Sequence, residues 1–289
     1  MLTPTAINTV VSAALLEDAP WGDLTSELLI PANAVATAEL VAREAGVFSG
    51  SAVFRAAFEL CDAAITVEFL VADAEPFSAG DVLARVSGSA RAILRGERIG
   101  LNFVQRMSAI AAHTAQYVAQ IQGTSARIAD TRKTTPGLRA IERQAVRDGG
   151  GHNHRFSLSD AVMAKDNHLA VLTASGISVT EALLSLRAQL SHTTHLEVEV
   201  DRIDQIEAVL AAGVDTIMLD NFTPEQLREG VALVAGRAIV EASGGVNLST
   251  VRAIAESGVD VISVGAITHS VRALDLGLDV RVETLATPH

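Results

Sequence analysis

The chain has 289 residues and a formal net charge of −12, which argues against nonspecific binding to nucleic acid or to a membrane surface. Hydrophobic residues make up 49% of it but aromatic residues only 3%, so we expect an aliphatic core. No apolar run reaches the roughly 18 residues of a membrane span. The first residues lack the basic stretch of a signal peptide, and the single cysteine, Cys61, excludes an internal disulfide and a cysteine metal cluster. We therefore expect a cytoplasmic protein, with Cys61 as a small buried hydrophobe.

The first part of the chain predicts an α+β sandwich domain over residues 1–112. A helical pattern comes first, followed by the loop E-D-A-P-W-G-D-L-T-S, which contains helix-breaking proline and glycine. Alternating patterns then predict strands at 35–43, 65–71 and 82–86, with a short helix at 51–60. A long helical stretch at 89–122 has apolar residues three and four apart and is expected to connect two domains.

The rest of the chain alternates strand and helix patterns and predicts a barrel domain over residues 113–270. Strands are expected at 126–130, 161–165, 195–200, 215–220, 237–242 and 261–265. Helices are expected at 138–148, 179–190, 204–211, 224–234 and 248–257, with N-caps at Asp204, Thr223 and Asn247. Such alternation predicts parallel strands joined by right-handed crossovers. Polar residues at the strand ends favour an irregular, open α/β barrel of about six or seven parallel strands. The tail, 271–289, is expected to join the N-terminal domain.

Positive charge is concentrated in one part of this acidic chain. Residues 127–155 hold seven basic and three acidic residues, and the chain's only two lysines are Lys133 and Lys165. Arg132 and Lys133 lie in D-T-R-K-T-T-P-G, between a predicted strand and a predicted helix whose free amides would point the same way. A lysine ammonium suits a phosphate or a carboxylate as a point charge. The pattern predicts a small anionic ligand held in a pocket.

A glycine-rich segment, G-G-G-H-N-H-R, ends the helix that follows this loop. Three glycines permit backbone conformations that other residues forbid, so His154 and Arg155 would project from a permissive frame. The spacing does not fit a dinucleotide-binding or a Walker loop. We interpret His152, in the same segment, as structural.

Two acids, Glu199 and Asp220, end consecutive predicted strands. They could bind ribose hydroxyls, support Mg²⁺ through water, or simply cap the loops that follow. Glu197 should point the same way as Glu199 but lie deeper, which makes it a weaker candidate.

Small residues end the last two predicted strands, in E-A-S-G-G-V and S-V-G-A-I-T-H-S. Such residues expose backbone N–H groups, as in the phosphate sites of barrels. The candidate phosphate-side residues are Ser243, Gly244, Gly245, Gly265 and Ala266. His269 is either a ligand contact or a helix cap.

Taken together, these motifs resemble the quinolinate phosphoribosyltransferase family over nearly the whole chain. The motifs that carry the resemblance are E-D-x-x-x-G-D-L-T, G-E-R-I-G-L-N-F, D-T-R-K-T-T-P-G-L-R, G-G-G-x-N-H-R, K-D-N-H, L-E-V-E-V, L-D-N-F, E-A-S-G-G-V and V-G-A-I-T-H-S. The resemblance implies transfer of phosphoribose from 5-phosphoribosyl-1-diphosphate to quinolinate with decarboxylation, which gives nicotinate mononucleotide, diphosphate and CO₂ in NAD biosynthesis. It also implies a Mg²⁺ requirement and a homodimer. The main departure is His152, where a small apolar residue is expected.

The resemblance also implies roles for single residues. Arg132, His154, Arg155 and Lys165 would hold quinolinate, and Arg98 would reach over from the other subunit. Lys133 and Lys165 would act on the diphosphate side. Glu199 and Asp220 would serve the ribose and the metal. Ser243, Gly244, Gly245 and Gly265 would cradle the 5′-phosphate.

Three other functions fit parts of the pattern. A lysine at a barrel strand end is also where Schiff-base enzymes place their nucleophile, so Lys165 could serve that role. A phosphoribosyltransferase of the same fold could use another acceptor, such as nicotinate. A phosphosugar sensor would bind the ligand without releasing diphosphate.

Overall fold

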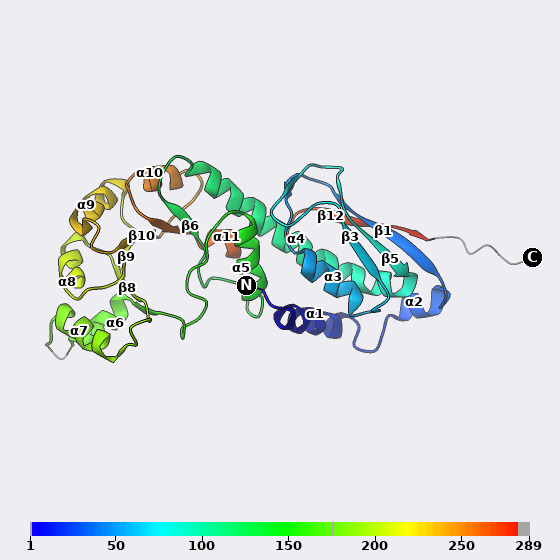
Figure 1. The fold of residues 1–289 in the computed structure, drawn as a ribbon, viewed down its shortest axis with the longest axis horizontal. Helices are drawn as coiled ribbons and strands as arrows, with labels where there is room; N and C mark the ends of the chain where they lie inside the picture. Colours follow the sequence, from blue (N-terminus) through cyan, green and yellow to red (C-terminus); the bar gives the residue numbers. More distant parts are fainter. Residues whose placement is uncertain (1, 175, 283–289) are drawn as a thin grey trace, which may run out of the picture. The chain divides into compact units, whose positions relative to one another are not determined.

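The computed structural model describes residues 2–174 and 176–282, which divide into two compact units (Figure 1). Residues 2–115, 134–150 and 270–282 form the first unit. Residues 116–133 and 151–269 form the second. Within the described residues, no helix combines the length and the apolar character needed to cross a bilayer.

The first unit is built on an antiparallel sheet in the order β12-β1-β5-β3. Its strands are β1 (Val35–Ala42), β3 (Thr66–Phe69), β5 (Val82–Ser89) and β12 (Leu276–Val282), and β2 (Gly46–Val47) pairs with β4 (Pro76–Phe77). Its helices are α1 (Pro4–Asp18), α2 (Leu24–Leu29), α3 (Ser51–Glu59), α5 (Arg139–Asp148) and most of α4 (Ala90–Gln120). Phe54 and Phe58 on α3 are fully buried, with ring centroids 4.9 Å apart. Helix α4 packs closely on α3, because a Cβ at Gly96 would lie 2.8 Å from the carbonyl oxygen of Ala57.

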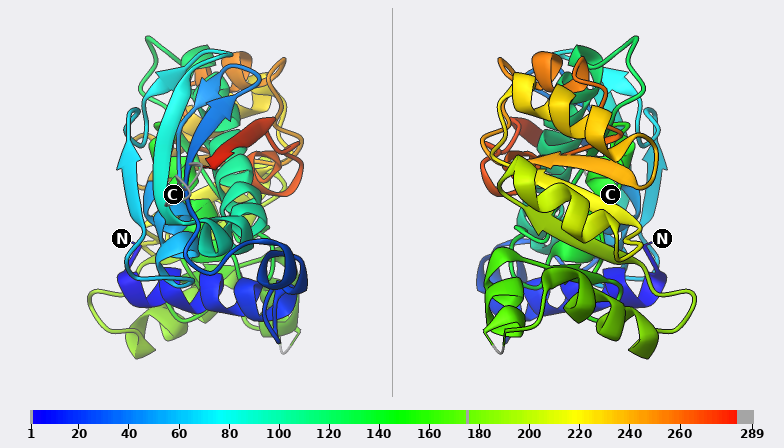
Figure 2. Two further views of the ribbon diagram at one scale, coloured as in Figure 1. Left: turned by 90° about the vertical axis from the view of Figure 1, so that its right-hand side faces the viewer. Right: turned by 90° about the vertical axis from the view of Figure 1, so that its left-hand side faces the viewer.

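The second unit contains a parallel sheet in the order β6-β11-β10-β9-β8-β7. Its strands are β6 (Arg127–Ala129), β7 (Val162–Ala164), β8 (Leu196–Val200), β9 (Thr216–Asp220), β10 (Ile239–Ser243) and β11 (Val261–Ser263). Its helices are α6 (Asp166–Thr173), α7 (Val179–Gln189), η1 (Ile203–Gln205), α8 (Ile206–Leu210), α9 (Pro224–Val234), α10 (Val251–Ala255) and α11 (Ala266–His269). Helices α8, α9 and α10 follow one another along the outer side of the strands (Figure 2, right). The predicted fold class is confirmed: an antiparallel N-terminal sheet and six parallel strands.

Several predicted element boundaries are wrong, each for a local reason. The loop predicted around Asp23 contains the start of α2, because the Asp23 side chain caps this helix by accepting the Ser26 N–H at 3.1 Å. The helix predicted from residue 248 begins at Val251, because the Asn247 side chain binds the Ser249 and Thr250 amides in a turn. Asp204 lies inside η1 instead of capping a helix. The Thr223 N-cap is confirmed, with its hydroxyl accepting the Gln226 N–H at 3.3 Å.

Two further features differ from the sequence interpretation. Cys61, just after α3, is partly exposed, because it lines a surface pocket together with Leu60 and Arg95. Residues 134–150, which fall in the barrel in the predicted division at 112/113, belong to the first unit. There the buried Glu142 of α5 accepts hydrogen bonds from Arg106 of α4 at 3.1 and 3.0 Å. The two-domain division with a returning tail remains a proposal, and residues 283–289 of that tail lie outside the described residues.

An ion pair on the second unit provides a test of stability against pH. Arg187 of α7 donates to both carboxylate oxygens of Asp215 at 2.6 and 2.8 Å, and these bonds lower the pKa of Asp215 to about 2. Asp215 is about one-third exposed, so solvent screens the pair and we expect Arg187→Met to cost about 1 kcal/mol of unfolding free energy at pH 7. The folded pKa lies below the unfolded value, so this stabilisation is present above about pH 4 and is lost as the pH falls toward 2. Urea unfolding should show that the difference in unfolding free energy between wild type and Arg187→Met is smaller at pH 3 than at pH 7. A difference that stays constant with pH would contradict this account.

Candidate active site

One cavity of about 410 Å³ lies at the carboxyl ends of the six parallel strands, and its lining comes entirely from the second unit. Every strand of the sheet supplies a lining residue, either from its last positions or from the loop that follows. Eight of the predicted site residues line it: Arg132, Lys133, His154, Arg155, Lys165, Glu199, Asp220 and Ser243. Thr131, Met163, Met218 and Ser263 complete the lining. The carboxyl ends of the strands are where barrel enzymes assemble their sites.

Asp130, at the end of β6, organises the glycine-rich segment. It is fully buried, and its carboxylate accepts the His154 backbone N–H and the Asn153 side-chain amide, both at 2.7 Å. The His152 main chain pairs with β6, donating to the Ile128 carbonyl at 2.8 Å and accepting from the Asp130 amide at 3.0 Å. His152 thus extends the sheet with its backbone, while its side chain is exposed. These bonds fix the point from which His154 and Arg155 project.

Two guanidinium groups, those of Arg132 and Arg155, line the same cavity. The Arg155 side chain donates to the Ala161 carbonyl at 2.9 Å, which holds it across its own loop. Burial lowers the pKa of Arg155, and the positive charge of Arg132 lowers it further. Two neighbouring cations facing one cavity favour an anionic ligand, since a bound anion relieves their repulsion.

Lys165 and Glu199 form an ion pair across the ends of β7 and β8. The lysine side chain is 44% exposed and that of Glu199 only 14%, so the ammonium lies toward the open side. Lys165 is also the residue that precedes α6, and its backbone N–H donates to the His168 ring at 3.0 Å. The K-D-N-H motif therefore fixes the lysine backbone through its own histidine.

Asp220 is held by its neighbour in the L-D-N-F motif. The Asn221 side-chain amide donates to one Asp220 carboxylate oxygen at 2.7 Å, and the Asn221 backbone N–H donates to the Ser243 carbonyl at 2.9 Å. Asn221 has a φ of 61°, and a Cβ at Gly244 would lie 2.2 Å from its side-chain oxygen. Only glycine fits at 244, because the ends of β9 and β10 approach so closely there.

The remaining predicted phosphate-side residues lie beside Lys133 or on adjacent loops and do not line the cavity. A Cβ at Gly265 would lie 2.9 Å from the Lys133 side chain and 3.2 Å from the His269 ring. The Thr268 hydroxyl donates to the Lys133 carbonyl at 2.9 Å, which ties α11 to the loop after β6. Ala266 begins α11, and Gly245 is exposed with a φ of 61°. Arg98 belongs to the first unit, where it is exposed on α4.

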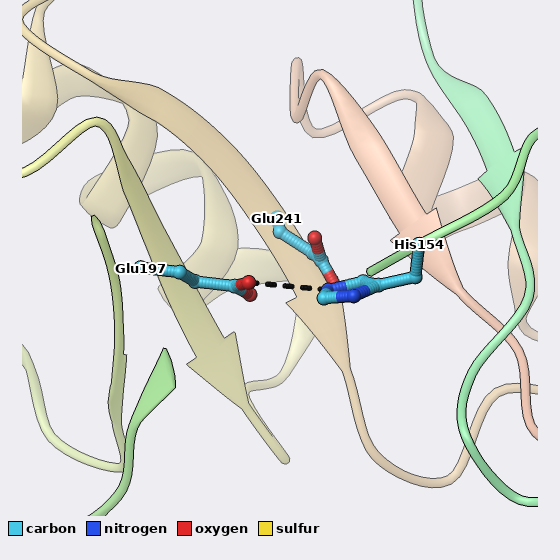
Figure 3. A group of neighbouring side chains, drawn as sticks. All are labelled: His154, Glu197 and Glu241. Carbon is cyan, nitrogen blue, oxygen red and sulfur yellow. Dashed lines mark ion pairs between the residues drawn. The ribbon is translucent and has the colours of Figure 1, made fainter. Parts of the chain in front are cut away.

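A buried cluster adjoins this cavity at His154 (Figure 3). The His154 Nε2 lies 3.1 Å from a carboxylate oxygen of Glu197 and 3.5 Å from one of Glu241, and Ser263 donates to Glu241. Burial lowers the pKa of His154, but the hydrogen bonds and charges of the two carboxylates outweigh it and raise this pKa to about 10. Burial raises the pKa of Glu197. The sequence interpretation treated Glu197 as a weak candidate and missed Glu241, although an acid within I-V-E-A-S is an available signal.

Family models for both domains of quinolinate phosphoribosyl transferase match the chain, the N-terminal one over residues 23–108 and the C-terminal one over residues 110–279. The chain belongs to the quinolinate phosphoribosyltransferase family. The predicted family is confirmed, and with it the prediction of a phosphoribosyltransferase enzyme.

Members of the quinolinate phosphoribosyltransferase family match the chain over most of its length. A probable nicotinate-nucleotide pyrophosphorylase (carboxylating) of Bacillus subtilis (strain 168) is 42% identical over 265 residues, covering 92% of this chain and 90% of the relative. The nicotinate-nucleotide pyrophosphorylase (carboxylating) of Mycobacterium leprae (strain TN) is 41% identical over 284 residues, 95% of this chain and 97% of the relative. The crystal structure of NadC from Streptococcus pyogenes has a TM-score of 0.93 at 40% identity, covering 98% of this chain and 99% of that one.

Proposed function

We propose that this enzyme transfers phosphoribose from 5-phosphoribosyl-1-diphosphate to the ring nitrogen of quinolinate and releases diphosphate and CO₂. The product is nicotinate mononucleotide, which places the enzyme in de novo NAD biosynthesis. The observation that carries the proposal is that cations and acids at the ends of four strands, with serines at the ends of the other two, line a single cavity. Family membership and the names of the relatives support the same acceptor.

Quinolinate, a pyridine dicarboxylate, needs several fixed positive groups. We assign Arg132, Arg155, His154 and Lys165 to the acceptor. Guanidinium forks bind carboxylates in a bidentate manner, and two such forks in one cavity lining suit a dianion. The cavity volume of about 410 Å³ lies within the usual range for small-ligand sites.

The phosphates of the donor need point charges and backbone amides. We assign Lys133 and Lys165 to the diphosphate. Ser243, Gly244, Gly245, Gly265 and Ala266 are assigned to the 5′-phosphate, with His269 either beside them or as the end of α11. Two observations support this assignment to the 5′-phosphate: Gly265 lies close to the Lys133 side chain, and only glycine fits the turn at 244. Small residues at such turns let the backbone come close to a phosphate.

Glu199 and Asp220 fit a Mg²⁺ ion that is held partly through water. Both are carboxylates at the ends of neighbouring strands, both line the cavity, and Mg²⁺ in such sites uses one or two carboxylates together with substrate phosphates. The same two residues are also placed to accept ribose hydroxyls. When bound, Mg²⁺ neutralises charge that develops on the leaving diphosphate.

The reaction requires the protein to position its substrates more than to transfer protons. The bond from C1′ to the diphosphate oxygen breaks and the bond from C1′ to the ring nitrogen forms, through an oxocarbenium-like state. The protein aligns the nitrogen, stabilises the leaving group and excludes water. In the second step the carbon–carboxylate bond next to the quaternised nitrogen breaks. Its electron pair stays on the ring carbon, which then takes a proton from solvent.

The direct test is an assay with purified protein, quinolinate, 5-phosphoribosyl-1-diphosphate and Mg²⁺, which should release CO₂ and form the mononucleotide together. Nicotinate in place of quinolinate should give no product, since one carboxylate leaves the paired guanidinium groups partly uncompensated. Turnover with nicotinate alone would favour the other-acceptor function. Ligand binding without diphosphate release would favour a sensor.

The enzyme is further proposed to be a cytoplasmic homodimer in which Arg98 completes the partner's acceptor site. The acidic charge and the single cysteine suit the cytoplasm. Arg98 is exposed on α4, and the first unit also exposes Trp21 at 94%, Leu28 at 80% and Leu29 at 74%. Such apolar exposure suits a surface that a second copy covers.

Subunit complementation should reveal an Arg98 that acts across the dimer. Arg98→Ala and Lys165→Met homodimers should each be nearly inactive. A co-expressed mixture should regain about a quarter of wild-type activity, because half of the dimers would be mixed and each would have one intact site. Mixing either variant with itself is the control, and a mixture that stays inactive would place Arg98 in its own subunit's site.

A further inference from the structure

The buried cluster beside the cavity has no evident structural need for its charges. Glu197 and Glu241 are only 3% and 4% exposed, and each lies on a strand between apolar neighbours. Charged groups in such places cost free energy, and apolar residues of similar volume often stabilise a fold more. Neither carboxylate lines the cavity, whereas their partners His154 and Ser263 both do. The cluster therefore reaches the ligand only through these partners.

Both ring nitrogens of His154 are already engaged. Nε2 lies between the two carboxylates, at 3.1 Å from Glu197 and 3.5 Å from Glu241 (Figure 3). Nδ1 lies 2.7 Å from the backbone nitrogen of Arg155, within its own loop. Carboxylates can only accept, so Nε2 must carry a hydrogen, and that hydrogen is turned toward the acids.

The backbone of His154 is fixed as well. Its N–H donates to the buried Asp130 at 2.7 Å, so the ring cannot swing far from the cluster. Ser263 in turn donates to Glu241, which orients this carboxylate toward the ring. With neither nitrogen available, the ring meets the cavity with its carbon atoms and its face.

We propose that Glu197 and Glu241, oriented by Ser263, are positioning residues that hold the His154 ring so that it packs against the acceptor instead of donating an N–H to a carboxylate. This inference rests on the proposed function, because it names what His154 does in the acceptor site. The carboxylates of the acceptor are then left to Arg132, Arg155 and Lys165.

A double-mutant cycle tests the proposal. Glu241→Gln keeps the size of the side chain and removes its charge, and His154→Gln removes the ring. Each should raise the KM for quinolinate by roughly tenfold and leave the KM for the phosphoribosyl donor nearly unchanged. If Glu241 acts through His154, the double variant should be no worse than His154→Gln alone. Additive effects, or equal changes in both KM values, would overturn the proposal.

Further variants keep the test decisive if Glu241→Gln folds poorly. Ser263→Ala retains both carboxylates and removes only the hydroxyl that orients Glu241, so it should raise the quinolinate KM a few-fold. That effect should also vanish in the His154→Gln background, and its persistence there would count against the proposal. The matched control is Glu256→Gln, an exposed acid paired with Arg252 in the same unit, which should change neither KM.

Two outcomes separate this inference from others. The three side chains offer ligand atoms within 4.8 Å of one another, so a tightly bound metal is the competing explanation. Stoichiometric zinc in the purified wild-type protein that is lost in Glu241→Gln would overturn the positioning role. A wild-type protein that makes no mononucleotide refutes the proposed function itself, whereas an active wild type with additive variants refutes only this inference.

Discussion

Replacing Lys165 by methionine is expected to lower kcat/KM by about 10²- to 10³-fold, the usual cost of removing one electrostatic group from a site where charge develops. Lys165 is half of the cavity's lysine pair, and in the structure its ammonium binds Glu199. The side chain is 44% exposed, so its loss should leave the fold intact. Methionine preserves the length of the stem, and steady-state kinetics with circular dichroism as the folding check would measure the effect.

A second substitution at the same position separates two mechanisms. Lys165→Arg keeps the positive charge but removes the primary amine, so it should retain more activity than Lys165→Met if the group acts as a cation. A Schiff-base mechanism requires the amine, and both variants would then be equally inactive. Borohydride trapping is easy to interpret here, because Lys133 and Lys165 are the chain's only lysines. A trapped adduct on Lys165 would replace the phosphoribosyl mechanism with the Schiff-base alternative.

The arrangement of the parallel strands could be predicted because their sequence signals are local and repeated. The run T-I-M-L-D, for example, is short and largely buried, and it is followed by a helix that Thr223 caps. Short helices were harder, because a side chain can end or delay them. The Asn247 turn shortens α10 in this way. No local sequence signal places residues 134–150 in the first unit. Their contacts there, such as the bond from Arg106 to Glu142, join residues that are far apart in the sequence.

The cavity lining could be predicted from position along the chain, because in a parallel sheet the ends of all strands meet. Arg132, Lys165, Glu199 and Asp220 each lie at such an end. The groups that orient them are less visible in sequence. Asn221 binds the Asp220 carboxylate while its own backbone is left-handed, and a sequence pattern does not display that conformation. Asp130 is visible in the sequence as a polar strand end, but its bond to the His154 amide is not. Glu241 resembles an ordinary strand residue in the sequence, and only its burial beside His154 indicates a role.

The second large effect is expected at the paired guanidinium groups. Arg132→Ala should raise the dissociation constant for quinolinate by about 10- to 100-fold, since a hydrogen bond to a charged group is worth about 1.5–3 kcal/mol. The KM for 5-phosphoribosyl-1-diphosphate should change far less, because its phosphates are assigned to the lysines and the strand-end amides. Calorimetric titration with quinolinate alone measures the first quantity without turnover.

A control must distinguish direct binding of quinolinate by Arg132 from the general effect of positive charge near the cavity. Arg147→Ala, an exposed residue in the same basic stretch that bonds Gln144, removes equal charge outside the cavity and should leave quinolinate binding unchanged. Arg132→Lys should fall between wild type and alanine, since an ammonium replaces a fork by a point charge. Equal weakening by the alanine variants at 132 and 147 would mean that the cluster acts only through its general field. That result would contradict the assignment of quinolinate to this cavity. The two guanidinium groups of Arg132 and Arg155 are what distinguish the cavity from an ordinary phosphate site.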